Sequence, residues 1–173
     1  MLIIFLRGVR DATQKAYTDN LTGLMNRNRW NEVIHSDIAI PDPYSIVFMD
    51  LNGLKKINDT LGHEAGDQLI FQVSCMLRNI LPHTSVICRW GGDEFAVLLT
   101  GTDRRLLDRY EEAISSACAR YNEDHPALPM HLAVGAALST DHPGATRAEL
   151  FRLADEEMYR NKQLWYIRNR SGS

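Results

Sequence analysis

The stretch Ile87-Cys88-Arg89-Trp90-Gly91-Gly92-Asp93-Glu94-Phe95-Ala96-Val97-Leu98-Leu99 combines two apolar runs with a glycine pair and two adjacent acids. Apolar runs interrupted by glycines predict a β-hairpin, because glycine adopts the positive φ angles of tight turns. A hairpin does not require Asp93 and Glu94 side by side, since neighbouring carboxylates repel unless a cation or a proton lies between them. On its own the pair would be interpreted as a solvated turn, and the rest of the chain changes that interpretation.

The chain has 173 residues, of which 45% are hydrophobic and 24% charged, as in one globular domain with a sizeable core. Its net charge of −3 argues against a surface for polyanions, so we expect no nucleic-acid partner. The cysteines Cys75, Cys88 and Cys118 lack the spacing of a zinc site or a disulfide framework. We interpret them as reduced core thiols of a cytoplasmic domain.

The first six residues are apolar and are followed by Arg7 and Arg10. Six residues cannot cross a bilayer, which takes roughly 20. Two interpretations stay open: the end of a membrane helix that begins upstream and tethers the domain to the inner face, or a short segment packed on the domain or a partner helix. We expect a leading linker helix over residues 1–17, one folded domain over 18–168 and a flexible tail over 169–173.

Apolar residues at helical spacing, separated by capping and turn residues, alternate with short dense apolar runs along the chain. We expect helices over 9–17, 26–38, 53–59, 67–80, 103–122 and 146–165, and strands over 44–49, 85–90, 95–99 and 132–138. The order from the first strand is βααββαβα behind a leading helix. This order predicts an α+β domain in which helices pack against one sheet.

Carboxylates stand at the ends of two of these expected strands. Asp50 directly follows the strand over 44–49, and Asp93 and Glu94 begin another. If the strands are neighbours, three carboxylates converge and require a cation, and oxygen donors without His or Cys favour Mg²⁺ or Mn²⁺ over zinc. Mg²⁺ is usually shared with substrate phosphates, which indicates a nucleotide, and two such ions could activate an attacking hydroxyl.

Gly91-Gly92-Asp93-Glu94-Phe95 resembles the signature of the GGDEF family, the bacterial diguanylate cyclases. Further motifs at the expected intervals extend the resemblance from about residue 17 to residue 162. They are Asp19-Asn20-Leu21-Thr22-Gly23-Leu24-Met25-Asn26-Arg27, Asp50-Leu51-Asn52-Gly53-Leu54-Lys55-Lys56-Ile57-Asn58-Asp59, Gly62-His63-Glu64-Ala65-Gly66-Asp67, and Ala154-Asp155 through Tyr159 to Lys162.

The resemblance implies a fold similar to nucleotidyl cyclases and polymerase palm domains, with a ferredoxin-like, mostly antiparallel sheet flanked by helices. It implies that two GTP molecules condense into cyclic di-GMP and release two pyrophosphates. Each domain of a head-to-head homodimer would present one GTP, so that each 3′-hydroxyl attacks the α-phosphate of the other. The implied partners are therefore GTP, cyclic di-GMP, a second copy and an upstream sensor or membrane segment.

The resemblance also assigns roles to the acidic residues. Asp50 and Asp93 match the family's carboxylates for Mg²⁺ or Mn²⁺, two ions per site, with the Leu51 carbonyl assisting. Asp93 and Glu94 are the implied catalytic residues: Asp93 helps to deprotonate the 3′-hydroxyl, and Glu94 completes the acidic cluster and the metal site.

The remaining matched positions are implied to bind the substrate. Asn58 and Asp67 match residues that recognise the guanine edge, and His63 lies on the same wall. A carboxylate can accept from guanine N1–H and N2–H₂, whereas adenine offers no such pair of donors. Lys55 and Lys162 match the family's phosphate contacts, and Gly91 and Gly92 of the hairpin are also implied to bind the substrate. Each alone would be interpreted as a cap, a turn or a solvated residue, and for Arg89 a ligand contact and an ion pair both stay open.

Two departures from the family pattern affect function. Trp165-Tyr166 stand where the family often has Gly-Arg, so one phosphate contact is expected to be missing. Pro82-His83-Thr84-Ser85 stand where active members often carry the Arg-x-x-Asp of an inhibitory product site. Proline cannot replace a guanidinium that pairs with phosphate and guanine. We therefore predict a cyclase without product inhibition at that site.

The alternative function is a catalytically silent GGDEF-like regulatory domain that binds GTP or a partner protein. The intact signature favours the cyclase, because silent members usually have a broken one. A third hypothesis is synthesis of cyclic GMP-AMP. Asp67 argues against it, since members resembling that branch have serine there.

Overall fold

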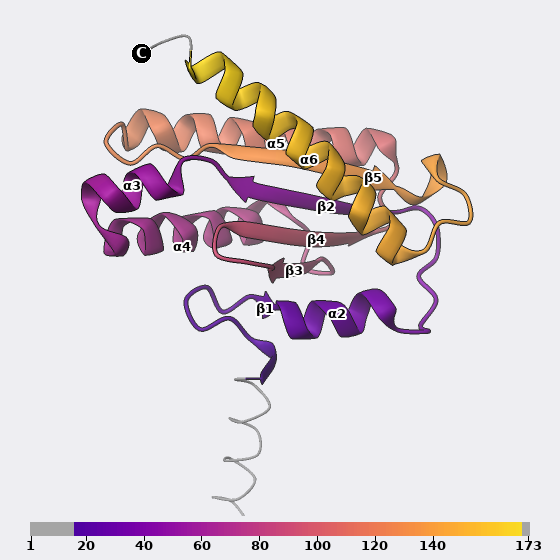
Figure 1. The fold of residues 1–173 in the computed structure, drawn as a ribbon. Coiled ribbons are helices and arrows are strands. Elements are labelled where there is room, and N and C mark those ends of the chain that lie inside the picture. The colour runs from indigo at the N-terminus through magenta and orange to yellow at the C-terminus, as the bar shows by residue number, and fades with distance from the viewer. Residues whose placement is uncertain (1–15, 171–173) are drawn as a thin grey trace, which may run out of the picture.

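The computed structural model describes residues 16–170, which form a single five-stranded sheet with helices on both faces (Figure 1). The strands are β1 (Met25–Asn26), β2 (Tyr44–Leu51), β3 (Val86–Arg89), β4 (Glu94–Thr100) and β5 (Leu132–Leu138). The helices are α2 (Arg27–His35), α3 (Leu54–Leu61), α4 (His63–Ile80), α5 (Arg104–Asp124) and α6 (Arg147–Arg170), with a 3₁₀ turn η1 (Ser139–Asp141).

The sheet has the strand order β1-β3-β4-β2-β5, with β2 between β4 and β5. All eight residues of β2 are buried, and β2 is antiparallel to both of its neighbours. The hairpin β3–β4 is antiparallel as well, and β1 pairs with β3 in parallel. The predicted mostly antiparallel α+β fold is confirmed, as is the order βααββαβα from β2 to α6.

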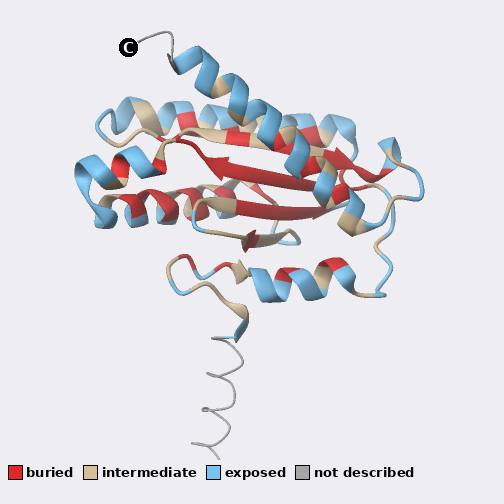
Figure 2. Ribbon diagram, viewed as in Figure 1, coloured by how far each residue is buried: buried red, intermediate tan, exposed pale blue. Residues whose placement is uncertain are grey.

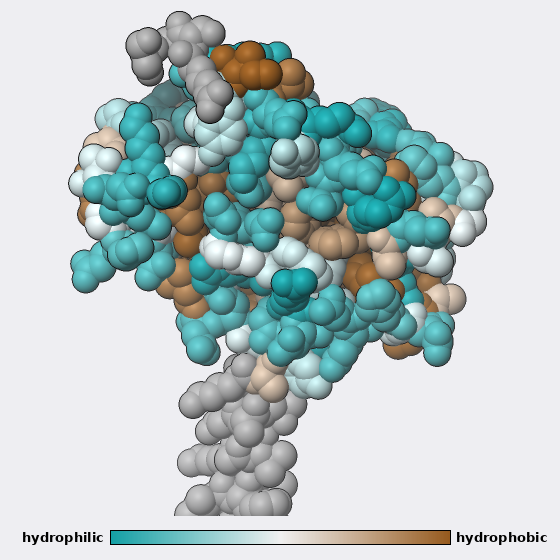
Figure 3. Space-filling view, in the orientation of Figure 1, coloured by the Kyte–Doolittle hydropathy of each residue, from teal (hydrophilic) through white to brown (hydrophobic). Residues whose placement is uncertain are grey.

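Each face of the sheet has its own apolar core, because side chains of a strand alternate between the two faces. Val47, Met49 and Leu51 of β2 pack with residues of α3, α4 and α5. Ile46 and Phe48 of β2 pack with residues of α2 and α6 on the other face. Buried residues accordingly follow the central strands in Figure 2, while the surface in Figure 3 is mostly hydrophilic with scattered apolar areas.

Helix α6 lies very close to the edge strand β5, and Gly135 is the residue that allows it. A Cβ atom at Gly135 would lie 2.1 Å from the Met158 nitrogen and 2.3 Å from the Ala154 oxygen. Only a residue without a side chain fits beneath the helix backbone at this distance. The crossing of α6 over β5 is therefore built into the sequence at this position.

Several predicted boundaries were wrong. Strand β2 continues through Asp50 to Leu51, and α4 begins at His63, because Gly62 alone makes the turn with a φ of 88°. Asn26 caps α2, and the helix ends at His35, which leaves Ile38 75% exposed. The two-residue strand β1 was not predicted, and α6 runs five residues past Trp165, to Arg170.

The hairpin prediction was correct in its strands but wrong in its turn. Strand β3 ends at Arg89 and β4 begins at Glu94, so residues 90–93 connect the strands, and the tight turn with positive φ at the glycines is not formed. The glycines with positive φ in the structure do not include Gly91 or Gly92. A Cβ atom at Gly91 would lie 2.3 Å from Oε2 of Glu94, so a larger residue there would displace the end of the Glu94 side chain.

Of the leading helix expected over 9–17, Ala16 and Tyr17 are helical, and the rest lies outside the described residues. The apolar run over 1–6 and the end of the expected tail, 171–173, also lie outside them. Within residues 16–170 no helix is both long and apolar enough to cross a membrane.

Candidate active site

The carboxylates singled out in the sequence lie at one end of the β2–β4 ladder. Asp50 of β2 and Glu94 of β4 are direct partners across the antiparallel pair. The residue before Glu94 also touches β2, because the Asp93 carbonyl accepts a hydrogen bond from the Leu51 nitrogen at 2.9 Å. The expectation that these two strands are neighbours is confirmed, and it brings all three acids to the same end of the sheet.

The cluster carries more negative charge than its surroundings stabilise. Asp50 is 3% exposed. Burial raises its pKa, the Lys162 hydrogen bond lowers it, and the charge of Asp93 raises it further. Burial also raises the pKa of Glu94, to which Asp50, Asp93 and Asp155 add. Carboxylates whose charged forms are destabilised in this way favour the binding of a cation.

Lys162 of α6 supplies the positive charge in this cluster. Its Nζ donates to Oδ2 of Asp50 at 2.6 Å. Burial opposes the ammonium form, but the hydrogen bond and charge of Asp50 leave the pKa of Lys162 above its usual value. The second carboxylate oxygen, Oδ1 of Asp50, is buried and has no hydrogen-bond partner among residues 16–170. One oxygen of the Asp50 carboxylate is therefore hydrogen-bonded, and the other lacks a partner from this part of the chain.

The predicted guanine-binding residues lie on α3 and α4. Asn58 is half-buried between the helices, and a Cβ atom on Gly66 would lie 1.9 Å from its Oδ1, which has no hydrogen-bond partner. His63 and Asp67 are exposed on one face of the first turns of α4, and Lys55 is exposed on α3. No hydrogen bond or ion pair among residues 16–170 joins His63, Asp67 or Lys55 to the acidic cluster. Their roles stay predictions.

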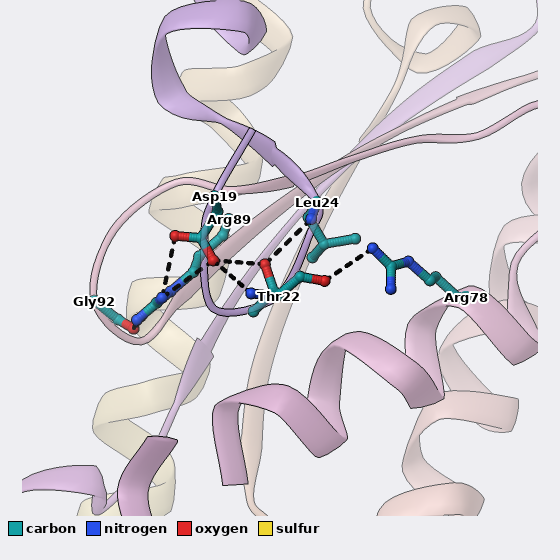
Figure 4. A network of polar contacts seen from close by, with 6 residues as sticks. All are labelled: Asp19, Thr22, Leu24, Arg78, Arg89 and Gly92. Atoms are coloured by element: carbon teal, nitrogen blue, oxygen red, sulfur yellow. Dashed lines mark hydrogen bonds and ion pairs between the residues drawn. The ribbon is translucent and has the colours of Figure 1, made fainter. Parts of the chain in front are cut away.

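Arg89 connects the loop that carries Gly91 and Gly92 to the motif over residues 19–27 (Figure 4). Its Nε and Nη2 donate to the Gly92 carbonyl at 3.2 and 2.8 Å, and Nη1 lies 3.2 Å from both Asp19 carboxylate oxygens. Asp19 also accepts from the nitrogen and hydroxyl of Thr22 at 2.9 and 2.7 Å, and Arg78 donates to the Thr22 carbonyl. Arg89 therefore pairs with an acid, and that acid comes from residues 19–27.

Two further residues, Asn52 directly after β2 and Trp165 on α6, were not among the predicted site residues. Asn52 is 2% exposed, and neither polar atom of its side chain has a hydrogen-bond partner among residues 16–170. Its backbone nitrogen donates to the His131 carbonyl at 2.7 Å. Trp165 packs against His131 with ring centroids 5.4 Å apart and lies over Gly53. Their signals were the position of Asn52 two residues after Asp50 and the position of Trp165 one helical turn after Lys162.

A divalent cation fits the chemistry of the cluster. Within the described residues, no three His, Cys, Asp or Glu side chains are already grouped so that they could hold a metal ion. The available donors are carboxylate oxygens, which Mg²⁺ and Mn²⁺ prefer. Oδ1 of Asp50 lacks a partner, and the raised pKa values of Asp50 and Glu94 indicate uncompensated charge. The residues present therefore fit a hard divalent cation.

The fold and this site define a palm-like α+β domain with a carboxylate cluster at the ends of two strands. More particularly, the chain belongs to the family described as the diguanylate cyclase GGDEF domain, whose model matches residues 16–165. The family implies dependence on a divalent metal. The family membership that the motifs indicate is therefore confirmed.

Relatives of known name include cyclases and phosphodiesterases. The chain is 33% identical over 172 residues to the probable diguanylate cyclase DgcT of Escherichia coli (strain K12), covering 94% of this chain and 38% of that protein. It is 35% identical over 159 residues to the cyclic di-GMP phosphodiesterase PdeR of the same strain, covering 86% and 23%. The chain thus spans less than two fifths of either relative.

Solved structures support the same fold. One describes an interaction mode between a microbial GGDEF domain and bis-(3,5)-cyclic di-GMP. It aligns with a TM-score of 0.72 and 28% identity, covering 87% of this chain and 93% of that one.

Proposed function

We propose that this domain is a diguanylate cyclase that condenses two GTP molecules into cyclic di-GMP and two pyrophosphates. The observation that carries the proposal is the direct pairing of Asp50 with Glu94, with Asp93 beside it, in a chain that keeps the whole family signature. This arrangement offers hard oxygen donors at the end of a buried strand, next to a lysine.

Asp50, Asp93, Glu94 and the Leu51 carbonyl would hold the divalent ions, Mg²⁺ or Mn²⁺ and two per site. When bound, such ions polarise phosphoryl oxygens and lower the pKa of an attacking hydroxyl. The chain's own contribution is to position the groups. Asp93, on the loop beside Leu51, would accept the proton of the 3′-hydroxyl, and Lys162 with Lys55 would supply positive charge to the triphosphate.

Selection of guanine would come from the α3–α4 pair. The Asp67 carboxylate can accept from guanine N1–H and N2–H₂, and the unpartnered Oδ1 of Asn58 is a further acceptor. His63 lies one turn before Asp67 on the same helix face. Adenine lacks this donor pair, so a site built on these acceptors would reject ATP.

The reaction needs two copies of the domain in a head-to-head homodimer. In each half, the 3′-oxygen of one GTP would bond to the α-phosphorus of the other, and the bond to pyrophosphate would break. Two such steps close the ring of cyclic di-GMP. An upstream sensor segment would control the geometry of the dimer.

We further propose that the product does not inhibit the enzyme at the usual site. The backbone nitrogen of Ser85 donates to the Pro82 carbonyl at 2.9 Å, which closes a turn without the arginine and aspartate of that site. A neighbouring surface cavity of about 450 Å³ is lined in part by Arg78, Pro82, His83 and Ser85. The Arg78 guanidinium already donates to the Thr22 carbonyl.

The test is incubation of concentrated protein with GTP and Mg²⁺, with products separated by chromatography and identified by mass. Cyclic di-GMP should form with the native chain, should vanish with Asp93→Ala, and should rise faster than linearly with protein concentration. Absence of product at every concentration, also after forced dimerisation and with GTP binding retained, would establish the silent regulatory domain instead.

A further inference from the structure

The middle of α6 is attached to the outer edge of β5 by two side chains. The Ala136 nitrogen donates to Oε2 of Glu157 at 2.9 Å, and Nδ2 of Asn161 donates to the Val134 carbonyl at 2.7 Å. Strand β5 is an edge strand of the sheet, so these backbone groups have no neighbouring strand. The two bonds lie on either side of Gly135, the point of closest approach of α6.

Apolar packing contributes little to holding the C-terminal half of α6 against β5. The buried apolar side chains of α6 are Leu150, Ala154 and Met158. Between Met158 and Asn169 no residue is buried, although Lys162 and Trp165 are half-buried. The position of this half therefore depends on polar contacts to β5 and on the packing of Trp165 against His131.

Lys162 directly follows Asn161, so the two bonds decide where its ammonium lies. Glu157 and Asn161 are four residues apart and share one helix face. Bonds at both positions fix the height of α6 along β5 and its rotation. A slide by one residue would move the helix by about 1.5 Å and turn it by roughly 100°, whereas Lys162 holds Asp50 at 2.6 Å.

We propose that Glu157 and Asn161 are positioning residues of the cyclase reaction: by binding the backbone of β5 on either side of Gly135, they place the Lys162 ammonium at the phosphate side of the acidic cluster. The inference rests on the proposed function, because Lys162 has its task only if a nucleotide binds there. The competing explanation is that the two side chains merely cover an edge strand.

Four variants separate these explanations. Glu157→Gln keeps an oxygen that can accept from Ala136, and Glu157→Ala removes it. Asn161→Asp has the same shape as the native residue but cannot donate to the Val134 carbonyl. Arg160→Ala changes an exposed residue of the same turn and serves as the matched control.

Two measurements are made on each variant of the full chain. The first is the split between kcat and KM for GTP with Mg²⁺, at a fixed protein concentration. The second needs no activity: protein labelled with 5-fluorotryptophan has three fluorine signals, from Trp30, Trp90 and Trp165. The Trp165 signal, assigned with Trp165→Phe, reports the position of α6, because this ring lies one turn beyond Asn161.

We expect Glu157→Ala and Asn161→Asp to raise KM for GTP about tenfold, since misplacement of a binding group by about 1 Å can cost up to roughly 100-fold. Their Trp165 signal should move while those of Trp30 and Trp90 stay, and Glu157→Gln and Arg160→Ala should behave as the native chain. An unmoved Trp165 signal with unchanged KM and lower thermal stability would overturn the positioning role. A native chain that forms no cyclic di-GMP would overturn the proposed function instead.

Discussion

The Lys162 ammonium lies 2.6 Å from the Asp50 carboxylate, although 112 positions separate the two residues in the sequence. The contact joins α6 to the end of β2 and places the positive charge of the site on a different element from its acids. The side chain of Asp50 is 4% exposed and that of Lys162 is 26% exposed. Loss of either partner therefore leaves a poorly solvated group without compensation.

Lys162→Met should destabilise the metal-free protein by about 1–3 kcal/mol, the usual cost of a buried acceptor that loses its partner. Urea unfolding in the presence of EDTA measures the change. The double variant Asp50→Asn/Lys162→Met should recover most of the stability, because no uncompensated carboxylate remains at position 50, while both proteins should fail to form cyclic di-GMP. Equal stability of Lys162→Met and the native chain would show that the pair contributes nothing.

The sequence allowed the prediction that Asp50, Asp93 and Glu94 lie together. It did not allow the prediction that Asp50 pairs with Lys162. A buried apolar run ending in Asp50 and a glycine-broken run beginning with Asp93 and Glu94 give strand ends directly. The position of Lys162 depends on where α6 crosses the sheet, and this crossing involves the backbone contact at Gly135 together with the bonds of Glu157 and Asn161 to β5. Nothing in local periodicity specifies such a crossing.

The hairpin shows the same limit at shorter range. The glycine pair correctly indicated a turn, but not its conformation. The connection over residues 90–93 is held by Arg89 and by the Trp90 and Gly91 nitrogens, which donate to the Glu94 carbonyl. Arg89 in turn depends on Asp19, 70 residues earlier. Contacts between distant segments therefore determine the conformation of this connection, which the local sequence does not specify.

Arg89→Lys should loosen the glycine loop. A single ammonium cannot reproduce the planar fork that binds the Gly92 carbonyl and Asp19 together. We expect a loss of about 1–3 kcal/mol in the free energy of unfolding, together with reduced cyclase activity, because Asp93 and Glu94 follow Gly92 directly. Chemical denaturation and the GTP assay measure the two effects.

A double-mutant cycle supplies the control for Arg89. Asp19→Asn should cost much less stability in the Arg89→Ala background than in the native chain, since the pair is 15% and 22% exposed and the interaction is already gone. Additive losses would show that Arg89 and Asp19 are not coupled.

Glu111 of α5 should make stability depend on pH. Burial raises its pKa, the charges of Glu157 and Asp108 raise it further, and Arg104 opposes them. A raised pKa in the folded state means that this group's contribution to stability is present at low pH and is lost as pH rises through that pKa. Glu111→Gln should therefore have a higher Tm than the native chain at pH 7.5.

Near pH 4, close to the ordinary pKa of glutamate at about 4.3, the advantage of Glu111→Gln should disappear. Thermal unfolding followed between pH 4 and 7.5 tests this, and Glu112→Gln, an exposed change on the same helix, should shift Tm little. A constant difference between Glu111→Gln and the native chain across this range would exclude titration of Glu111 as its cause.

The turn from Pro82 to Ser85 should determine whether the product regulates the enzyme. In the native chain, added cyclic di-GMP should leave the initial rate unchanged, because neither Pro82 nor Ser85 can pair with phosphate or guanine through a charged group. The double variant Pro82→Arg/Ser85→Asp should become inhibited. Two charged hydrogen bonds at roughly 1.5–3 kcal/mol each correspond to product binding tighter by about 100-fold or more.

Initial rates and isothermal titration with cyclic di-GMP measure this difference, with Pro82→Ala/Ser85→Ala as the control that loosens the turn without adding charge. Inhibition of the native chain that disappears with His83→Ala would contradict the prediction. It would mean that the cavity beside Arg78 binds the product through other groups. Inhibition confined to the charged variant would show that this turn, rather than the catalytic residues, separates an unregulated cyclase from a feedback-inhibited one.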